Sequence, residues 1–509
     1  MSTKIIARNS LWYGVETVIG LVSGLFTTIA IARVLGPEKL GPFVYVGWLT
    51  SVAASLGGLG IPAATSKYMG EYLGRGELGI ARAMFFLTLR LQTILAVCLT
   101  ALGLSAVFLI ADPSKVVFAG LLTASILPMM INFIPAQANA ASEDLWANVP
   151  ASIASTLVYV CGVILVLTFS WGLRGLAANV LLMRLVDLIV RFVPAYRRLS
   201  KLPSDIVPIE VRSKLFIFAR QNVVLLFLSA IVWDRSEMFF LQYFSDVRQL
   251  AFYSVVINIT ERLRLVPQIF GNALNPTIMA QYGRDANRLT GMVSTALRYL
   301  GLVILPVNVG IAVLSAPFIR LTYGAKYLEA IPLMAFASLL AIPKALLSPV
   351  SSFLGATENQ HIVVRWTLVV AVVNVALDLW LIPTGGAFGA VIANGVAQIV
   401  IALLLFLHAA KLLAIRLPIR SLAKITLSTA VMAGAVCLVP LTRWTPIVAL
   451  LIGTAIAAIV LLLMLRVTRS IEPRDLERFQ SARRRIPDKL GSWLDRGLAL
   501  LIPSPALGR

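Results

Sequence analysis

The chain has 509 residues, of which 59% are hydrophobic and only 13% charged, and its mean hydropathy is +0.88. A soluble domain carries about 25% charged residues, so this composition excludes an ordinary soluble protein. Apolar runs long enough to cross a hydrocarbon layer about 30 Å thick recur throughout the chain. The runs are continuous and do not alternate with polar residues, which excludes an outer-membrane barrel. We therefore predict an all-α polytopic membrane protein.

The apolar runs divide into about 14 predicted transmembrane helices. In chain order they cover about residues 8–33, 41–65, 84–110, 116–138, 148–170, 174–195, 214–243, 249–276, 294–318, 328–354, 362–383, 386–409, 422–440 and 445–466. Because the number of spans is even, both ends of the chain are expected on the same side of the membrane.

The net charge is +21, and the distribution of the basic residues along the chain agrees with this predicted topology. With the amino terminus inside, about 29 Lys and Arg residues lie on cytoplasmic segments, about 8 on outer loops and about 7 within spans, as the positive-inside rule requires. The basic excess therefore indicates orientation and contact with membrane lipids, and we expect no nucleic-acid partner. The prediction is a multi-pass protein of the cytoplasmic membrane with both termini cytoplasmic.

A weak internal repeat with a period of about 214 residues divides the chain. "ASEDLWANV" at residue 141 corresponds to "ATENQHIVV" at 356, and "GLRGLAAN" at 172 corresponds to "GAFGAVIAN" at 386. The repeat predicts two pseudo-symmetric six-helix lobes followed by two extra helices. The expected parts are an N-terminal lobe (1–200), a C-terminal lobe (201–412), the two extra helices (413–466) and a cytoplasmic amphipathic tail (467–509).

Groups typical of catalytic and metal sites are scarce. His361 and His408 stand singly, and the three cysteines all lie inside predicted spans. "GGLGIP" at residue 57 lacks the third glycine of a dinucleotide-binding fingerprint and follows no strand, so we interpret it as a close contact between helices. We expect no cofactor, no metal site and no enzymatic activity.

Charged and polar residues inside spans are the candidate functional groups, because each costs several kcal/mol unless it is paired or hydrated. On the eighth span, polar residues recur at spacings of 4, 3, 3, 4, 4 and 3, which places them on one helical face. The residues are Ser254, Asn258, Glu261, Arg264, Gln268, Asn272 and Asn275. Such a face packs against another polar helix or lines water, and the number of positions in register favours water.

Other spans also carry intramembrane charges, with basic groups in excess, which indicates an anionic ligand. They are Arg184, Asp187 and Arg191 in the sixth span, Arg220 and Asp234 in the seventh, Lys344 in the tenth, and Asp378, one turn after Asn374, in the eleventh. In the seventh span, Asp234, Arg235 and Glu237 cannot all face lipid, because successive residues are about 100° apart round a helix. They form either a local ion-pair cluster or part of the hydrated cavity beside the eighth span; we favour the cavity.

Three long segments resemble a known family. "ARVLGPEKLGPFVYVGWLTSVAASLGGLGIPAATSKYMGE" is similar to the first hairpin of the polysaccharide and oligosaccharide flippases of the MOP superfamily. "WDRSEMFFLQYFSDVRQLAFYSVVINITERLRLVPQIFGNALNPTIMAQYG" resembles the seventh and eighth helices of that family, and "ATENQHIVVRWTLVVAVVNVALDLWLIPTGGAFGAVIANGVAQ" its eleventh and twelfth. The likeness covers about residues 1–410. Arg262 and Arg264 beside Glu261 make this chain more basic there than the family pattern.

The resemblance implies a two-lobed bundle whose central cavity alternates its access between the two sides of the membrane. It also implies transport of a polyprenyl-diphosphate-linked oligosaccharide from the inner to the outer leaflet, for O-antigen, capsule or exopolysaccharide assembly. The groups expected to bind the diphosphate are Arg264, Arg262, Arg235, Arg220, Arg184 and Lys344. The expected polar lining is Asn258, Glu261, Gln268 and Asn272, and the candidates for coupling to H⁺ or Na⁺ are Asp234, Glu237 and Asp378. We expect a monomer whose partners are this lipid-linked substrate and the surrounding lipids.

Three alternatives remain open. A lipid II flippase has a related substrate, and a cation-coupled multidrug (MATE-type) exporter has a related fold, although its pocket should be acidic and aromatic. A membrane glycosyltransferase or polymerase would need a sizeable outer loop with acidic and basic groups, and the predicted outer loops are only a few residues long.

Overall fold

The structure is a computed structural model that describes residues 3–232, 236–263, 267, 286–356, 359–413 and 417–471. These residues are helical with short connections, and they contain no strand. They divide into two compact units: unit 1 is Met1–Ser254 with Ile382–Gly386, and unit 2 is Val255–Leu381 with Ala387–Arg509. The expected division into lobes at residue 200 stays a prediction.

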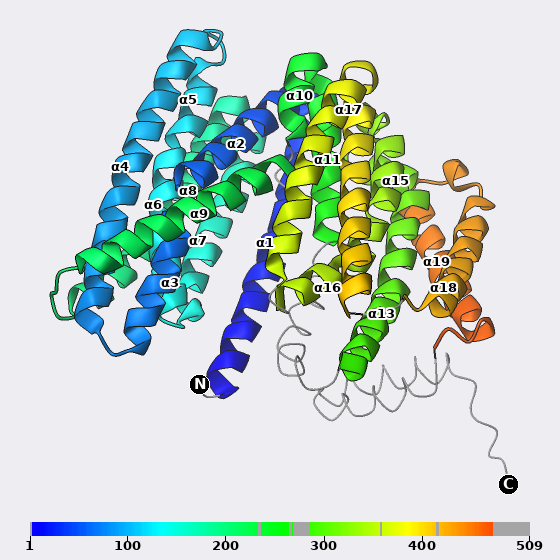
Figure 1. The fold of residues 1–509 in the computed structure, drawn as a ribbon. Coiled ribbons are helices and arrows are strands. Elements are labelled where there is room, and N and C mark those ends of the chain that lie inside the picture. Colours follow the sequence, from blue (N-terminus) through cyan, green and yellow to red (C-terminus); the bar gives the residue numbers. More distant parts are fainter. Residues whose placement is uncertain are drawn as a thin grey trace. The chain divides into compact units, whose positions relative to one another are not determined.

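The described residues of unit 1 form eleven α-helices, the last of which continues into unit 2, and a short part of α17 (Gln360–Leu413). They are α1 (Thr3–Leu35), α2 (Pro37–Gly57), α3 (Ile61–Gly74), α4 (Leu78–Ile110), α5 (Val116–Ala124), α6 (Ile126–Ala141), α7 (Val149–Thr168), α8 (Gly172–Ser200), α9 (Ile209–Val232), α10 (Glu237–Phe244) and α11 (Val247–Leu263). Helix α4 lies beside α5 and α6, as Figure 1 shows in blue and cyan. One core cluster of unit 1 joins α3, α4, α6 and α9 through fully buried side chains that include Met69, Phe85, Ile134 and Leu215.

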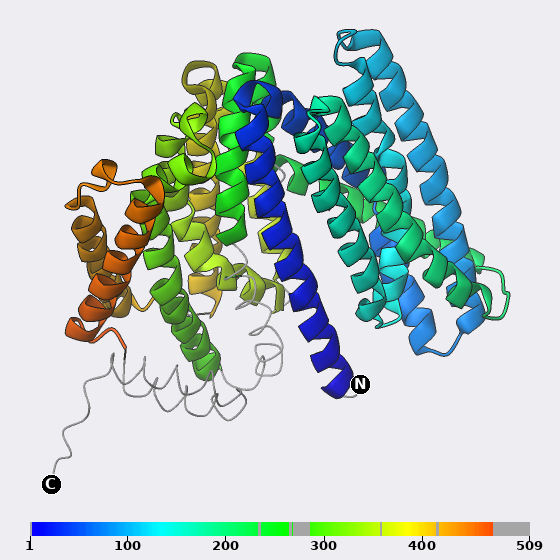
Figure 2. The ribbon, with the colours of Figure 1, turned by 180° about the vertical axis from the view of Figure 1, so that it is seen from behind.

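The described residues of unit 2 form seven more α-helices. They are α13 (Ala286–Val313), α14 (Ser315–Thr322), α15 (Ala330–Leu340), α16 (Ile342–Ala356), α17 (Gln360–Leu413), α18 (Ile419–Cys437) and α19 (Pro446–Val467). Helices α18 and α19 pack side by side, as the orange ribbons of Figure 2 show. Leu314, between α13 and α14, packs with Met432 and Val436 of α18 and Ala457 of α19 in one apolar cluster.

Within the described ranges, nine helical segments are long and apolar enough to cross a membrane. One of them, His361–Leu412, has 52 residues, while a single crossing needs about 20. Its helical geometry is interrupted at Gly386, where φ is 52° and ψ is −132°, so it consists of the two helices predicted there. The all-α membrane fold is thereby confirmed, whereas the number of 14 spans stays a prediction.

The predicted span 41–65 is two helices, because the chain breaks between α2 and α3. Gly60 has a φ of 72°, in the left-handed region that favours glycine, and Pro62 follows in the first turn of α3. A Cβ atom on Gly60 would lie only 2.3 Å from the carbonyl oxygen of Ala219 on α9. The break therefore lets the backbone of α9 approach, and the interpretation of "GGLGIP" as a close helix contact is confirmed.

The repeated motif "GLRGLAAN" has a packing role in unit 1. Asn179 at its end donates a hydrogen bond from Nδ2 to the backbone oxygen of Tyr159, at 2.9 Å. A Cβ atom on Gly162 of α7 would lie 1.9 Å from the Asn179 Oδ1 atom. The amide of Asn179 thus fills the space that glycine leaves and fixes α8 against α7.

Candidate functional site

Unit 1 contains a polar network at the meeting of α6, α7 and α8. Asp187 accepts hydrogen bonds from Asn132 Nδ2, at 2.6 Å, and from Arg191 Nη2, at 3.0 Å. Arg191 Nη2 also contacts Ser152 Oγ at 3.3 Å. The side chains of Arg191 and Asp187 are only 13% and 14% exposed. The charges predicted on one face of the sixth span therefore form a largely buried ion pair, held from the side by an amide and a hydroxyl.

A pocket of about 250 Å³ adjoins this network. It lies where α1 faces α7 and α8, and its lining is Ile19, Gly20, Ser152, Ile153, Ser155, Thr156 and Asp187. Arg184 lies one turn before Asp187 on α8 and interacts electrostatically with Asp187 and with Tyr159 on α7. The pocket and its surroundings thus combine guanidinium groups, hydroxyls and the carboxylate of Asp187, a mixture that can bind an anionic, hydroxyl-rich ligand.

The seventh predicted span divides its candidate residues between α9 and α10. Arg220 on α9 is exposed, and it forms no ion pair with the described part of the chain. Glu237 in the first turn of α10 is fully buried and accepts a hydrogen bond from Tyr253 Oη, at 2.9 Å. A buried carboxylate is tolerated only with such partners. Asp234 and Arg235 lie outside the described residues, so both the ion-pair cluster and the favoured cavity lining stay predictions.

The structure describes only the first part of the polar face of the eighth span, which holds Ser254, Asn258 and Glu261. Ser254 is buried and donates to the Ala251 oxygen at 2.9 Å, while Asn258, Glu261 and Arg262 are half-buried. Arg262 Nε donates to the backbone oxygen of Asn258 at 3.0 Å, which turns its guanidinium along the helix. The other residues of this polar face lie outside the described residues: they are Arg264, Gln268, Asn272 and Asn275.

Arg262 has a neighbour outside the spans in unit 2. It interacts electrostatically with Tyr323, which follows α14 and is fully buried against Tyr327, with 5.5 Å between the ring centres. Burial raises the pKa of both phenols well above the ordinary value, so both stay protonated and uncharged.

The remaining candidates lie on α16 and α17 of unit 2. Lys344 is half-buried on α16. Asn374 and Asp378, one turn apart on α17, are 1% and 0% exposed, and Asn374 Nδ2 donates to Asp378 Oδ2 at 3.3 Å. The described residues contain no group of three or more His, Cys, Asp or Glu side chains that could hold a metal ion.

Unit 2 also has an apolar pocket of about 390 Å³, which the sequence did not indicate. It is lined by residues of α11, α13, α14, α15, α18 and α19: Ile259, Pro306, Val307, Gly310, Ile311, Leu314, Phe318, Met334, Met432, Leu450, Thr454, Ala457, Ala458 and Leu461. Thr454 supplies its one hydroxyl. Such a lining suits a hydrocarbon chain, because burying apolar surface is favourable without any directed polar contact.

The sequence comparison decides the family. The sequence model of a family described as polysaccharide biosynthesis protein matches residues 30–332, more than half of the chain. The chain belongs to this family. A second family model, described as lipid II flippase MurJ, matches residues 255–464 of the chain. No curated protein sequence matches it.

Three solved structures are similar to this chain. The lipid II flippase MurJ in an inward closed conformation has a TM-score of 0.73 at 18% identity, covering 92% of this chain and 99% of its own. An inward-facing MATE-family multidrug resistance transporter of the MOP superfamily has a TM-score of 0.64 at 19% identity, covering 78% and 94%. A MOP superfamily transporter from Pyrococcus furiosus, described as having a binding pocket of reversed polarity, has a TM-score of 0.56 at 19% identity, covering 81% and 96%. At these identities the likeness establishes the fold, which is that of MOP transporters and flippases.

Proposed function

We propose that this chain is a flippase for a polyprenyl-diphosphate-linked oligosaccharide. It moves the substrate from the inner to the outer leaflet of the cytoplasmic membrane by alternating access, and so supplies O-antigen, capsule or exopolysaccharide assembly. The observation that carries this proposal is the family match over residues 30–332, joined to a fold of membrane transporters. Both termini lie in the cytoplasm, and the protein acts as a monomer.

The diphosphate is the part of this substrate that the intramembrane cations recognise. Arg184 on α8, Arg262 on α11 and Lys344 on α16 are all half-buried inside helices of the bundle. A guanidinium group presents a planar set of donors that matches phosphate oxygens, and its attraction to an anion grows as water is excluded. The exposed Arg220 and the two arginines outside the described residues, Arg235 and Arg264, complete the proposed anion-binding set.

The polyprenyl chain and the sugars call for different surroundings. The apolar pocket between α13, α14, α18 and α19 offers a place for a length of polyprenyl chain. The hydroxyls and amides of Ser152, Ser155 and Asn258 offer hydrogen-bond partners of the kind that sugars use.

Two sources of energy are open for the transport step. Moving negative charge outward across an inside-negative potential is favourable by about 2.3 kcal/mol per charge per 100 mV. If a coupled H⁺ or Na⁺ is needed as well, Asp234, Glu237 and Asp378 are the candidate sites. Glu237 and Asp378 suit such a role because both carboxylates are fully buried beside polar neighbours, Tyr253 and Asn374.

A lipid II flippase is the second candidate function. The MurJ family model matches 255–464, which includes the apolar pocket of unit 2. Lipid II is also a polyprenyl diphosphate carrying sugars, so the cationic and apolar features serve both substrates. A MATE-type exporter of cationic drugs fits less well, because the excess of basic groups would repel such drugs.

Complementation in two bacterial strains separates these functions. One strain lacks its oligosaccharide flippase, and the other is depleted of its lipid II flippase. We expect restoration of surface polysaccharide in the first strain and no rescue of growth in the second; the opposite pattern would replace the proposal by lipid II transport.

Arg262→Gln should abolish the activity and Arg262→Lys should keep part of it, because lysine retains the charge and loses the planar fork. Arg466→Gln at the exposed end of α19 is the matched control.

A further inference from the structure

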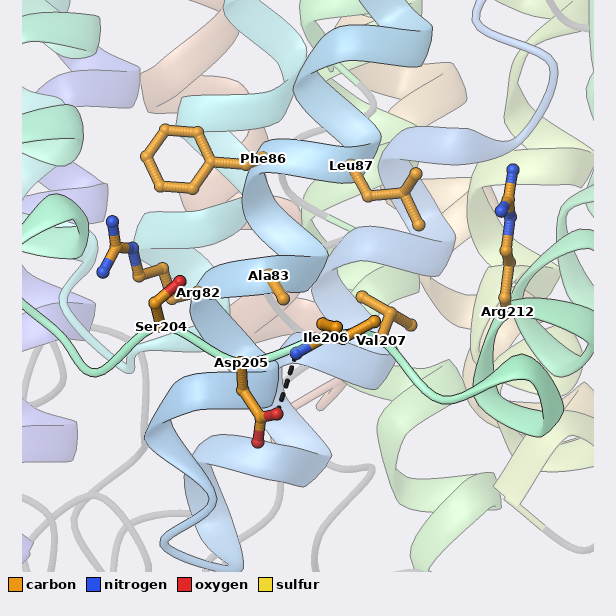
Figure 3. A pocket seen from close by; sticks show the side chains of 9 residues that line it. All are labelled: Arg82, Ala83, Phe86, Leu87, Ser204, Asp205, Ile206, Val207 and Arg212. Atoms are coloured by element: carbon orange, nitrogen blue, oxygen red, sulfur yellow. Dashed lines mark hydrogen bonds between the residues drawn. The ribbon is translucent and has the colours of Figure 1, made fainter.

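A pocket of about 370 Å³ lies away from the polar network, where the connector between α8 and α9 (residues 201–208) crosses the start of α4. Figure 3 draws the nine residues that line it: Arg82, Ala83, Phe86, Leu87, Ser204, Asp205, Ile206, Val207 and Arg212. The volume falls within the range of small-ligand sites, about 300–1,000 Å³. All nine residues belong to unit 1.

Two arginines flank this connector pocket from opposite sides, with Ile206 and Val207 between them in the view of Figure 3. Arg82 Nη1 donates to the carbonyl oxygen of Leu202 at 2.6 Å, and its guanidinium carbon lies 5.7 Å from the centre of the Phe86 ring. These contacts hold Arg82 against the connector and leave its other nitrogens without a hydrogen bond to the described residues. Arg212 is exposed and forms no ion pair in the described part of the chain.

The one carboxylate of the connector pocket is used by the connector itself. Asp205 Oδ1 accepts a hydrogen bond from the backbone N–H of Ile206 at 2.8 Å, the dashed line of Figure 3. Asp205 also sits directly over Gly79, where a Cβ atom would lie 2.8 Å from the Asp205 Cβ atom. Two guanidinium groups against one engaged carboxylate leave the pocket with a net positive charge, so an anion is the favoured occupant.

Large apolar side chains stand beside these charges. Ile206 is 84% exposed and Ile209, the first residue of α9, is 86% exposed. The connector joins α8 and α9, and the basic residues Arg197, Arg198, Lys201 and Arg212 lie on it or on the adjoining turns of these helices. Exposed apolar residues next to basic ones, at the end of membrane helices, are the pattern of a surface that dips into the headgroup region.

We propose that the connector pocket binds the phosphate headgroup of an anionic phospholipid from the adjoining leaflet. The phosphate occupies the pocket that Arg82 and Arg212 flank, and the acyl chains run along Ile206 and Ile209. A guanidinium group is well matched to phosphate oxygens, whereas a zwitterionic headgroup carries no net charge for the pocket to attract. This lipid is a bound partner of the α8–α9 connector and is distinct from the transported substrate.

Native mass spectrometry of the full-length protein, released from micelles with equal phosphatidylglycerol and phosphatidylcholine, tests the proposal. We expect wild-type protein to retain phosphatidylglycerol preferentially. Arg82→Gln with Arg212→Gln should weaken this retention about tenfold or more, because charge-assisted contacts to the phosphate are lost. Arg197→Gln is the matched control, because Arg197 is exposed at the end of α8 and does not line the pocket.

Each contrary outcome overturns the proposal in a different way. Undiminished retention by the double variant places the lipid elsewhere. An equal loss in Arg197→Gln means a general attraction to basic surface, and displacement of the lipid by inorganic phosphate at equal concentration means a free-phosphate site. If losing the Arg82–Leu202 bond prevents folding, Arg212→Gln alone decides, since the Arg212 side chain is exposed and forms no hydrogen bond or ion pair with the described residues. Unchanged retention in that variant also rejects the site.

Discussion

Asp187 is the centre of the polar network in unit 1, because it pairs with Arg191 and accepts from Asn132. Asp187→Asn leaves the Arg191 guanidinium largely buried without its counter-ion, and we expect a loss of about 3–5 kcal/mol in unfolding free energy. Adding Arg191→Gln should restore part of that loss, since no unpaired charge then remains. Thermal unfolding of the purified variants in detergent measures both effects. Equal stability of wild type and Asp187→Asn would mean that the pair contributes nothing.

The hydrogen-bonded pair of Glu237 and Tyr253 can be tested by a double-mutant cycle. Tyr253→Phe removes the hydroxyl that donates to the buried carboxylate, and we expect about 2 kcal/mol of destabilisation, the cost of a hydrogen bond to a charged group. In the Glu237→Gln background the same change should cost only about 1 kcal/mol, because the acceptor is then neutral. Identical costs in both backgrounds would show that Glu237 is already protonated in the folded protein. The comparison therefore reports the charge state of a candidate ion-coupling residue.

At the scale of elements, the break between α2 and α3 sets how closely α9 packs. Gly60→Ala forces a side chain into a left-handed conformation, which costs about 1–2 kcal/mol, and places its Cβ against Ala219. We expect strongly reduced amounts of folded protein in the membrane, measured by fluorescence-detected gel filtration. Gly47→Ala is the control: it lies inside α2 with open space around it, and alanine favours a helix there by about 1 kcal/mol. Equal yields of the two variants would contradict this role for Gly60.

The same break indicates why sequence reasoning located helices better than their interruptions. Hydrophobic runs predict spans because an apolar run of about 20 residues forms a helix long enough to cross the hydrocarbon layer. The glycines of "GGLGIP" indicated a close helix contact, but its partner, α9, is distant in the sequence, so local composition did not show that the contact interrupts the span. Charges on one face of α8 were predicted from spacing, whereas Asn132 was missed because a single amide in an apolar helix is common. The apolar pocket of unit 2 was missed because its lining resembles lipid-facing surface.

At the scale of the whole molecule, the distribution of Lys and Arg predicts orientation. Cysteines at Lys39, Lys326 and Arg443, all exposed, should react with an impermeant thiol reagent added outside intact cells. A cysteine at Arg197 should react only after the membrane is permeabilised. Arg197 is preferred to Arg198, because Arg198 bonds to Asp144 at 3.1 Å and to Asn139 at 2.9 Å. Labelling of Arg197→Cys from outside would reverse the orientation and the proposed direction of transport.

The central claim is that the chain carries a polyprenyl-diphosphate-linked oligosaccharide across a bilayer. Its most direct test is reconstitution of the purified protein in liposomes containing that lipid with a labelled sugar, followed by addition of an enzyme that reaches only outer-leaflet sugars. We expect the accessible fraction to rise from about half toward completion in protein-containing vesicles under an inside-negative potential. Arg262→Gln should keep the accessible fraction at the level of protein-free vesicles, and Arg466→Gln should behave as wild type. An accessible fraction that stays at the protein-free level with wild-type protein, with or without an H⁺ or Na⁺ gradient, would contradict the account.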